Sequence, residues 1–135
     1  MSELVNPKEY GKFFDEILGL DPKIRSVGIY DGKYHAKFKN QFGGLVKDEE
    51  IKFSFSEAKQ KWEIREQMDL NAGEPRFTMS QRGKINRLVF SIGKDGIVVI
   101  TTELYIDANK LVDKIVAIRG LFQYNLTSFF IDKLH

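Results

Sequence analysis

The stretch "PRFTMSQRGKINRLVFSIGKDGIVVITTELY", residues 75–105, decides the fold class, because it predicts three consecutive antiparallel strands. Gly83 and the segment "GKDG" (93–96) divide it into three runs, and Asp-Gly is a strong turn signal. The last run, residues 97–105, is apolar at successive positions, which is typical of a strand covered on both faces. The middle run separates into two faces, with Asn86, Leu88, Phe90 and Ile92 on one and Ile85, Arg87, Val89 and Ser91 on the other. We therefore predict a three-stranded meander here.

A hairpin is predicted upstream, where residues 23–30 and 33–40 flank the dipeptide Asp31-Gly32. Together with the meander it gives a five-stranded antiparallel sheet. The second arm, "KYHAKFKN", alternates strictly, and one of its sides is wholly basic. That basic side consists of Lys33, His35, Lys37 and Lys39. Arg25 and Arg87 are candidates to extend it.

The basic side of this arm has several interpretations. It can be the solvated face of an edge strand, where lysines discourage aggregation, or it can face the carboxylates of a neighbouring helix. Those carboxylates are Glu57, Glu63, Glu66 and Asp69. It can also bind an acidic protein or another anion. A nucleic-acid surface is disfavoured, because Tyr34 and Phe38 point to the other side and leave no ring for base stacking.

Two helices are predicted at the ends of the chain. The first spans residues 7–18 behind the N-cap Asn6, and its apolar side chains recur at helical spacing. The last begins after the N-cap Asp107, and we expect the tail beyond Gly120 to continue or restart it. The tail carries five large apolar side chains, which we expect to pack on the domain or on a second protomer: Leu126, Phe129, Phe130, Ile131 and Leu134.

A further helix is predicted between the hairpin and the meander, from about Ser56 to Leu70, with Ser54 or Ser56 as its cap. Its apolar positions form a narrow, split stripe: Phe55, Ala58, Trp62, Ile64 and Met68. Such a stripe predicts a helix that lies across a surface instead of deep in a core.

The composition limits the classes of function. The net charge of +2, from 21 Lys and Arg against 19 Asp and Glu, is low for a dedicated nucleic-acid binder. The chain has no cysteine, which excludes disulfides and thiol catalysis, and its two histidines argue against a histidine metal site. The N-terminus lacks a secretory pattern and no run of about 18 apolar residues occurs, so we expect a cytoplasmic protein that does not enter a membrane. We expect one domain over residues 1–135, with a core of about 6–122 and a tail of 123–135.

The order helix, hairpin, helix, three-stranded meander, helix resembles that of roadblock (dynein-light-chain type) domains, to which profilin and longin domains are close in architecture. The resemblance is carried by the two turns "YDGK" and "GKDG" and by the lone helix between hairpin and meander, and it runs from Asn6 to about Phe122. The chain is also similar to small roadblock-like proteins of archaea. The resemblance implies an α+β fold in which the first and third helices cover one face of the sheet and the second helix covers the other.

The resemblance also implies pairing through the second helix and the edge strand after it, and a role as a platform for other proteins, notably small GTPases. The candidate interface residues there are Trp62, Met68, Phe77 and Met79. Tryptophan and methionine are enriched at interfaces. The alternative for Trp62 is that it simply packs on the sheet.

The function that we favour from the sequence is a non-enzymatic, homodimerising scaffold or regulatory module that binds another protein, with no cofactor. One alternative is a small-ligand sensor of the PAS or profilin type, although the eleven Phe argue for a filled core. Another is a weak binder of anions or nucleic acid through the basic side. An enzyme is disfavoured, because the candidate acids and bases, Asp31, His35, Glu103 and Asp107, fall in turns, caps or solvated faces.

Overall fold

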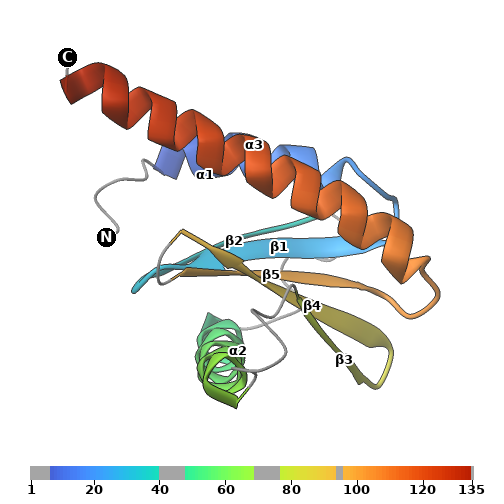
Figure 1. Ribbon diagram of the computed structural model, residues 1–135. Coiled ribbons are helices and arrows are strands. Elements are labelled where there is room, and N and C mark those ends of the chain that lie inside the picture. The colour runs from blue at the N-terminus through green and yellow to red at the C-terminus, as the bar shows by residue number, and fades with distance from the viewer. Residues whose placement is uncertain (1–6, 40–47, 69–76, 94–95, 135) are drawn as a thin grey trace.

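The computed structural model describes residues 7–39, 48–68, 77–93 and 96–134 (Figure 1). Predictions that fall on residues 1–6, 40–47, 69–76, 94–95 or 135 lie outside the described part of the chain. In chain order the elements are α1 (Pro7–Leu18), β1 (Ile24–Tyr30), β2 (Tyr34–Phe38), α2 (Asp48–Met68), β3 (Thr78–Arg82), β4 (Ile85–Ile92), β5 (Gly96–Glu103) and α3 (Ala108–Leu134).

The strands form one five-stranded sheet in the order β2-β1-β5-β4-β3, and every neighbouring pair is antiparallel. The predicted α+β class is therefore confirmed. Gly32 and Gly83 have positive φ angles of 106° and 55°, which glycine adopts without the steric cost of a Cβ atom, so both hairpin turns form where they were predicted.

Helices cover both faces of the sheet, with α1 and α3 on one side and α2 on the other (Figure 1). The larger core lies under α1 and α3 and includes Phe13, Phe90 and Ile115. The smaller core lies under α2 and is built around Phe55 and Trp62. The central strand β5 supplies Val98 and Ile100 to the larger core and Ile97 and Val99 to the smaller one, which explains why it is apolar at successive positions.

Helix α2 starts earlier than predicted, and the structure decides between the two alternatives predicted for the end of α3. Helix α2 begins at Asp48, eight residues before the predicted start at Ser56, so neither Ser54 nor Ser56 is a cap. Serine is only mildly unfavourable inside a helix. Phe55, between the two serines, packs against the sheet from within α2. Helix α3 runs unbroken from Ala108 through Gly120, so the tail continues the helix instead of restarting it.

Candidate interaction surface

The basic side of β2 faces α1. His35 and Lys37 stand opposite Ile29 and Val27, whose side chains lie in the larger core, so all four project to the same face of the sheet. Lys37 Nζ forms an ion pair with Asp15 Oδ1 of α1 at 2.5 Å. The basic side chains His35 and Lys37 therefore lie close to α1 and are not directed at α2, whereas the Tyr34 ring on the other side of β2 lies near Phe55 of α2.

The interpretation that these lysines face the carboxylates of the second helix is therefore wrong for the residues that the structure describes. On α2, Glu57 pairs with Arg87 and Lys61, and Glu63 pairs with Lys59. Arg87 likewise does not extend the basic side of β2, because it projects toward α2. The pairing register of the strands decides which side chains face α1 and which face α2. The sequence of one strand does not reveal which helix covers which of its faces.

The end of the basic side lies against backbone and carboxylates. Lys39 Nζ donates a hydrogen bond to the Asp21 carbonyl at 2.7 Å. Burial lowers the pKa of Lys39, and the charges of Asp21 and Glu103 partly raise it again. The side chain of His35 lies against the Tyr10 ring, with 5.0 Å between the ring centres. Lys33 remains an exposed residue of the turn.

Asp31 anchors the hairpin to α1. The Tyr10 hydroxyl donates a hydrogen bond to Asp31 Oδ2 at 2.5 Å. Burial, and then this hydrogen bond, raise the pKa of Tyr10 above its ordinary value.

Asp107 caps α3 by accepting a hydrogen bond from the Lys110 amide at 3.2 Å. Within the described part of the chain, no three His, Cys, Asp or Glu side chains gather as a metal site.

Three of the four residues predicted to form an interface, Trp62, Phe77 and Met79, do not come together. Trp62 is only 2% exposed and packs in the core between α2 and the sheet. Phe77 lies on the opposite face, where its ring is 5.9 Å from that of Phe90 in the larger core. Met79 is 45% exposed and stands opposite Leu88, so it also projects to the α1 and α3 side. The side chain of Met68 lies outside the described set.

Among the side chains of α2 that the structure describes, the exposed large apolar ones are Phe53 and Ile64, at 68% and 56% exposure. They are eleven residues apart, about three helical turns, and so lie on one side of the helix. The buried residues Phe55, Ala58 and Trp62 lie on the other side. The prediction missed Phe53, because the helix start was placed after it. Ile64 lies off the main apolar stripe of the helix, and this was the feature of the sequence that indicated an exposed apolar side chain.

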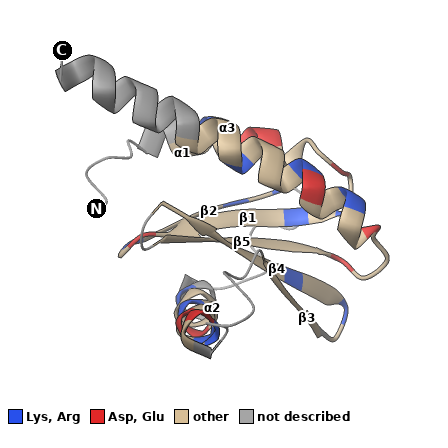
Figure 2. Ribbon diagram, viewed as in Figure 1, with Lys and Arg blue, Asp and Glu red and all other residues tan. Residues whose placement is uncertain are grey.

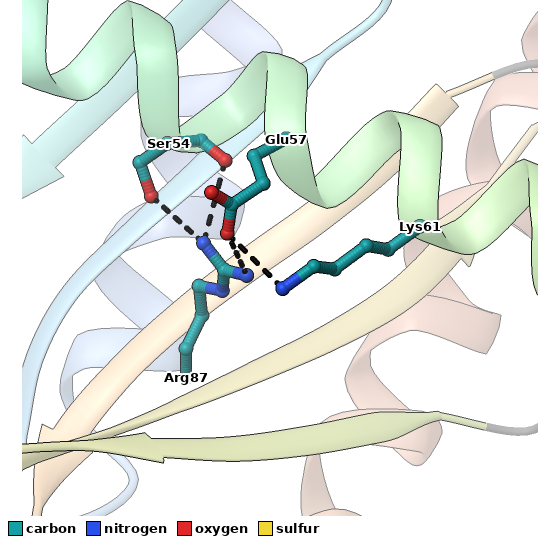
Figure 3. Close-up of polar contacts among 4 residues, drawn as sticks. All are labelled: Ser54, Glu57, Lys61 and Arg87. Atoms are coloured by element: carbon teal, nitrogen blue, oxygen red, sulfur yellow. Dashed lines mark hydrogen bonds and ion pairs between the residues drawn. The ribbon is translucent and has the colours of Figure 1, made fainter.

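Helix α2 is held on the sheet at two points. The first is Gly28 of β1, where the Phe55 ring takes the place of a side chain: a Cβ atom there would lie 2.1 Å from Phe55 Cζ. The second is Arg87 of β4, whose side chain is 10% exposed (Figure 3). Its Nη2 atom is 3.1 Å from Glu57 Oε1, and its Nη1 atom donates to Ser54 Oγ at 3.2 Å.

Helix α2 carries residues of both charges (Figure 2). Glu57 Oε1 also accepts the Lys61 ammonium at 3.2 Å, and Lys59 lies 3.6 Å from Glu63. Both are i,i+4 pairs with the acid and base in adjacent turns. The helix therefore presents two large apolar side chains among charges of both signs.

The strand after α2 is an edge of the sheet. β3 pairs with β4 and has no second strand neighbour among the described residues. Its sequence, "TMSQR", contains no proline and carries its one charge at the last position. It therefore lacks the lysines and prolines that commonly protect an edge, whereas β2 at the opposite edge is followed and preceded by lysines.

The fold is shared with solved structures of roadblock proteins. The roadblock/LC7 domain from Streptomyces avermitilis superposes with a TM-score of 0.70 at 11% identity, over 86% of this chain and 96% of that one. MglB from Myxococcus xanthus gives a TM-score of 0.70 at 10% identity, over 90% of each chain. A structure of MglB with a tetrameric arrangement gives 0.63 at 10% identity, over 92% of this chain and 94% of its own.

The chain thus has a roadblock-like fold, as the order of its elements predicted. Its sequence matches no protein-family model and no curated protein. The helices that the structure describes include none that is long and apolar enough to cross a membrane.

Proposed function

We propose that this protein is a non-enzymatic, homodimerising scaffold or regulatory module that binds another protein. The observation that carries the proposal is the pair Phe53 and Ile64, which stand exposed on the outer side of a helix whose inner side is already packed on the sheet. Large apolar side chains that stay exposed on one side of a helix, with polar residues between them, are candidates for burial against a partner.

The spacing of this pair suits a second copy of the same chain. In a two-fold interface, residue i meets residue j and residue j meets residue i. Two antiparallel α2 helices that cross near Ala58 and Lys59 place Phe53 of each protomer on Ile64 of the other. The same crossing sets the Glu57 end of one helix toward the Lys61 end of the other, so that unlike charges meet at the centre.

The open edge of β3 supports the same arrangement. An unpaired strand edge accepts another strand by main-chain hydrogen bonds, and β3 has few of the features that prevent this. The roadblock resemblance implies pairing through these two elements, and one similar structure is of an MglB with a tetrameric arrangement.

The partner implied by the resemblance is a small GTPase, for which a dimer would serve as a platform. An acidic partner docking on the basic side of β2 has less support, because Lys37 is paired with Asp15 and Lys39 with the Asp21 carbonyl. Nucleic-acid binding has less support as well, because Lys37 already pairs with the carboxylate of Asp15 and offers its charge less readily to a phosphate.

Sedimentation velocity of the wild type beside Phe53→Lys and Ile64→Lys tests the proposal. We expect a wild-type dimer, and folded monomers for both variants at the same concentration, because a lysine on each α2 is brought against an apolar partner. Leu121→Lys is the matched control: Leu121 is 63% exposed on α3, on the other face of the sheet, and the change should leave the dimer intact. A wild type that is monomeric at high concentration contradicts the proposal.

A further inference from the structure

Helix α2 is apolar on two sides, so burial of apolar surface alone does not fix how it is rotated on the sheet. The inner side buries Phe55, Ala58 and Trp62, of which Ala58 contributes little area. The outer side carries Phe53 and Ile64. A rotation by half a turn would exchange these sets, and the difference in buried apolar area between the two arrangements is limited to a few side chains. Besides the fit of the Phe55 ring over Gly28, a directional polar interaction can therefore help to decide the rotation.

Arg87 provides a directional interaction under α2. On β4 it stands opposite Ser80 of β3 and Thr101 of β5, within a polar row that crosses the sheet beneath the helix. Its guanidinium reaches up to Ser54 and Glu57, which are three residues apart and therefore on one side of α2 (Figure 3). That side lies between the buried and the outward apolar sets.

A rotated α2 would withdraw both partners from Arg87. The guanidinium is nearly buried and keeps its charge, so it would then lie under the helix without a carboxylate. Leaving one member of a buried ion pair uncompensated is strongly unfavourable, whereas an intact pair adds little net stability over an apolar replacement. The pair is therefore suited to select one rotation of the helix and not to raise the overall stability.

We infer that Arg87 is the positioning residue of the self-association surface: through Ser54 and Glu57 it sets the rotation of α2 that turns Phe53 and Ile64 outward to a second copy. The inference rests on the proposed function and assigns to it a residue that does not itself touch the partner.

The test removes both charges at once, so that no buried charge is left alone. The double variant Arg87→Met/Glu57→Gln should unfold with a free energy equal to or above that of the wild type, and its dimer dissociation constant should rise at least tenfold. Trp62, the single tryptophan, gives a second measurement. It is shielded in the observed rotation, so its emission should shift to longer wavelength and acrylamide should quench it more in the folded double variant.

Lys59→Gln/Glu63→Gln is the matched control, because it removes an ion pair of the same helix that does not reach Arg87. It should change the dissociation constant by less than about threefold and leave Trp62 shielded. Ser54→Ala guards against a double variant that fails to fold. It removes the Ser54 hydroxyl that accepts from Arg87, leaves the Ser54 carbonyl in place and favours the helix, so weaker association without lower stability supports the inference.

The outcomes separate the two proposals. The role of Arg87 is overturned if the folded double variant dimerises as the wild type does and Trp62 stays shielded. If the double variant does not fold, the same result with Ser54→Ala overturns it. In either case the dimer itself remains in place. A wild type that stays monomeric overturns the proposed function and, with it, the assignment of Arg87 to self-association.

Discussion

Gly28 is the residue on which the contact between α2 and the sheet depends most closely. Its hydrogen leaves room for the Phe55 ring, and an added Cβ would also come within 3.0 Å of the His35 carbonyl oxygen. Gly28→Ala should therefore lower the free energy of unfolding by about 1–3 kcal/mol, the usual cost of overpacking. Urea unfolding followed by circular dichroism measures this difference.

Gly120 is the matched control for that substitution. It lies exposed within α3, and a Cβ there would meet nothing within 4 Å. Gly120→Ala should raise the free energy of unfolding by about 0.5–1 kcal/mol, because alanine is the better helix former. If Gly28→Ala proves as stable as the wild type, the close approach of Phe55 to β1 is contradicted.

Tyr10 predicts a pH dependence at the residue scale. Burial and the hydrogen bond to Asp31 raise its pKa in the folded protein above the ordinary value of about 10. Above pH 10 the unfolded chain loses this proton while the folded chain keeps it, so stability is fully present below pH 10 and falls as pH rises further. Each pH unit contributes up to about 1.4 kcal/mol of loss.

Tyr10→Phe should remove that part of the alkaline loss, at a cost of roughly 1 kcal/mol near pH 7 for the lost hydrogen bond. Urea unfolding between pH 8 and pH 11 measures it as the difference in slope, since the lysines titrate equally in both proteins. Tyr105→Phe alters an exposed tyrosine and should keep the wild-type slope. Equal slopes for wild type and Tyr10→Phe would mean that Tyr10 is not held by Asp31.

At the scale of elements, α2 carries a phenylalanine on each of its two sides, so the contributions of the two sides to stability can be compared directly. Phe55 is 5% exposed against the sheet, and Phe53 projects to solvent two residues earlier. Phe55→Ala should lower the free energy of unfolding of the monomer by about 3–5 kcal/mol, whereas Phe53→Ala should change it by less than about 0.5 kcal/mol. Urea unfolding at low protein concentration distinguishes the two, and similar losses for both would place α2 in a different rotation.

The sequence predicted elements well where one local pattern was sufficient. Helix α1, both glycine turns and the two-sided burial of β5 follow from spacing, turn residues and continuous apolarity. The start of α2 did not follow, because Ser54 resembles a cap and only the packing of Phe55 shows that the helix has already begun. Local preference was overridden there by a tertiary contact.

The candidate surface was harder to predict than the fold, for a reason that also lies in the elements. Trp62 and Phe77 have the residue types of an interface, but one faces β5 and the other packs on Phe90 across the sheet. In the sequence, Arg87 is not distinguished from the other basic residues of the strands. Its pairing with Glu57 depends on which strand lies beneath α2. Faces of elements are fixed by topology, which short-range patterns do not contain.

At the scale of the whole molecule, the two faces of the sheet are covered unequally. Two helices close the side of α1 and α3, whereas α2 alone covers the other and keeps two large apolar side chains outside. The edges are also unequal, since β2 is flanked by lysines and β3 is not. Both asymmetries concern α2 and β3, the two elements through which we propose that a second copy of the chain binds.

Association of this kind predicts that stability depends on protein concentration, because a dimer that forms only from folded chains draws the folding equilibrium toward itself. Between about 1 and 100 µM, the melting temperature of the wild type should rise by several degrees, since a hundredfold change in concentration stabilises the dimer by up to about 2.7 kcal/mol. Phe53→Lys/Ile64→Lys should melt at one temperature throughout this range, and Leu121→Lys should follow the wild type. A wild-type melting temperature that is independent of concentration, together with a monomer mass in solution, would contradict self-association through the exposed side of α2.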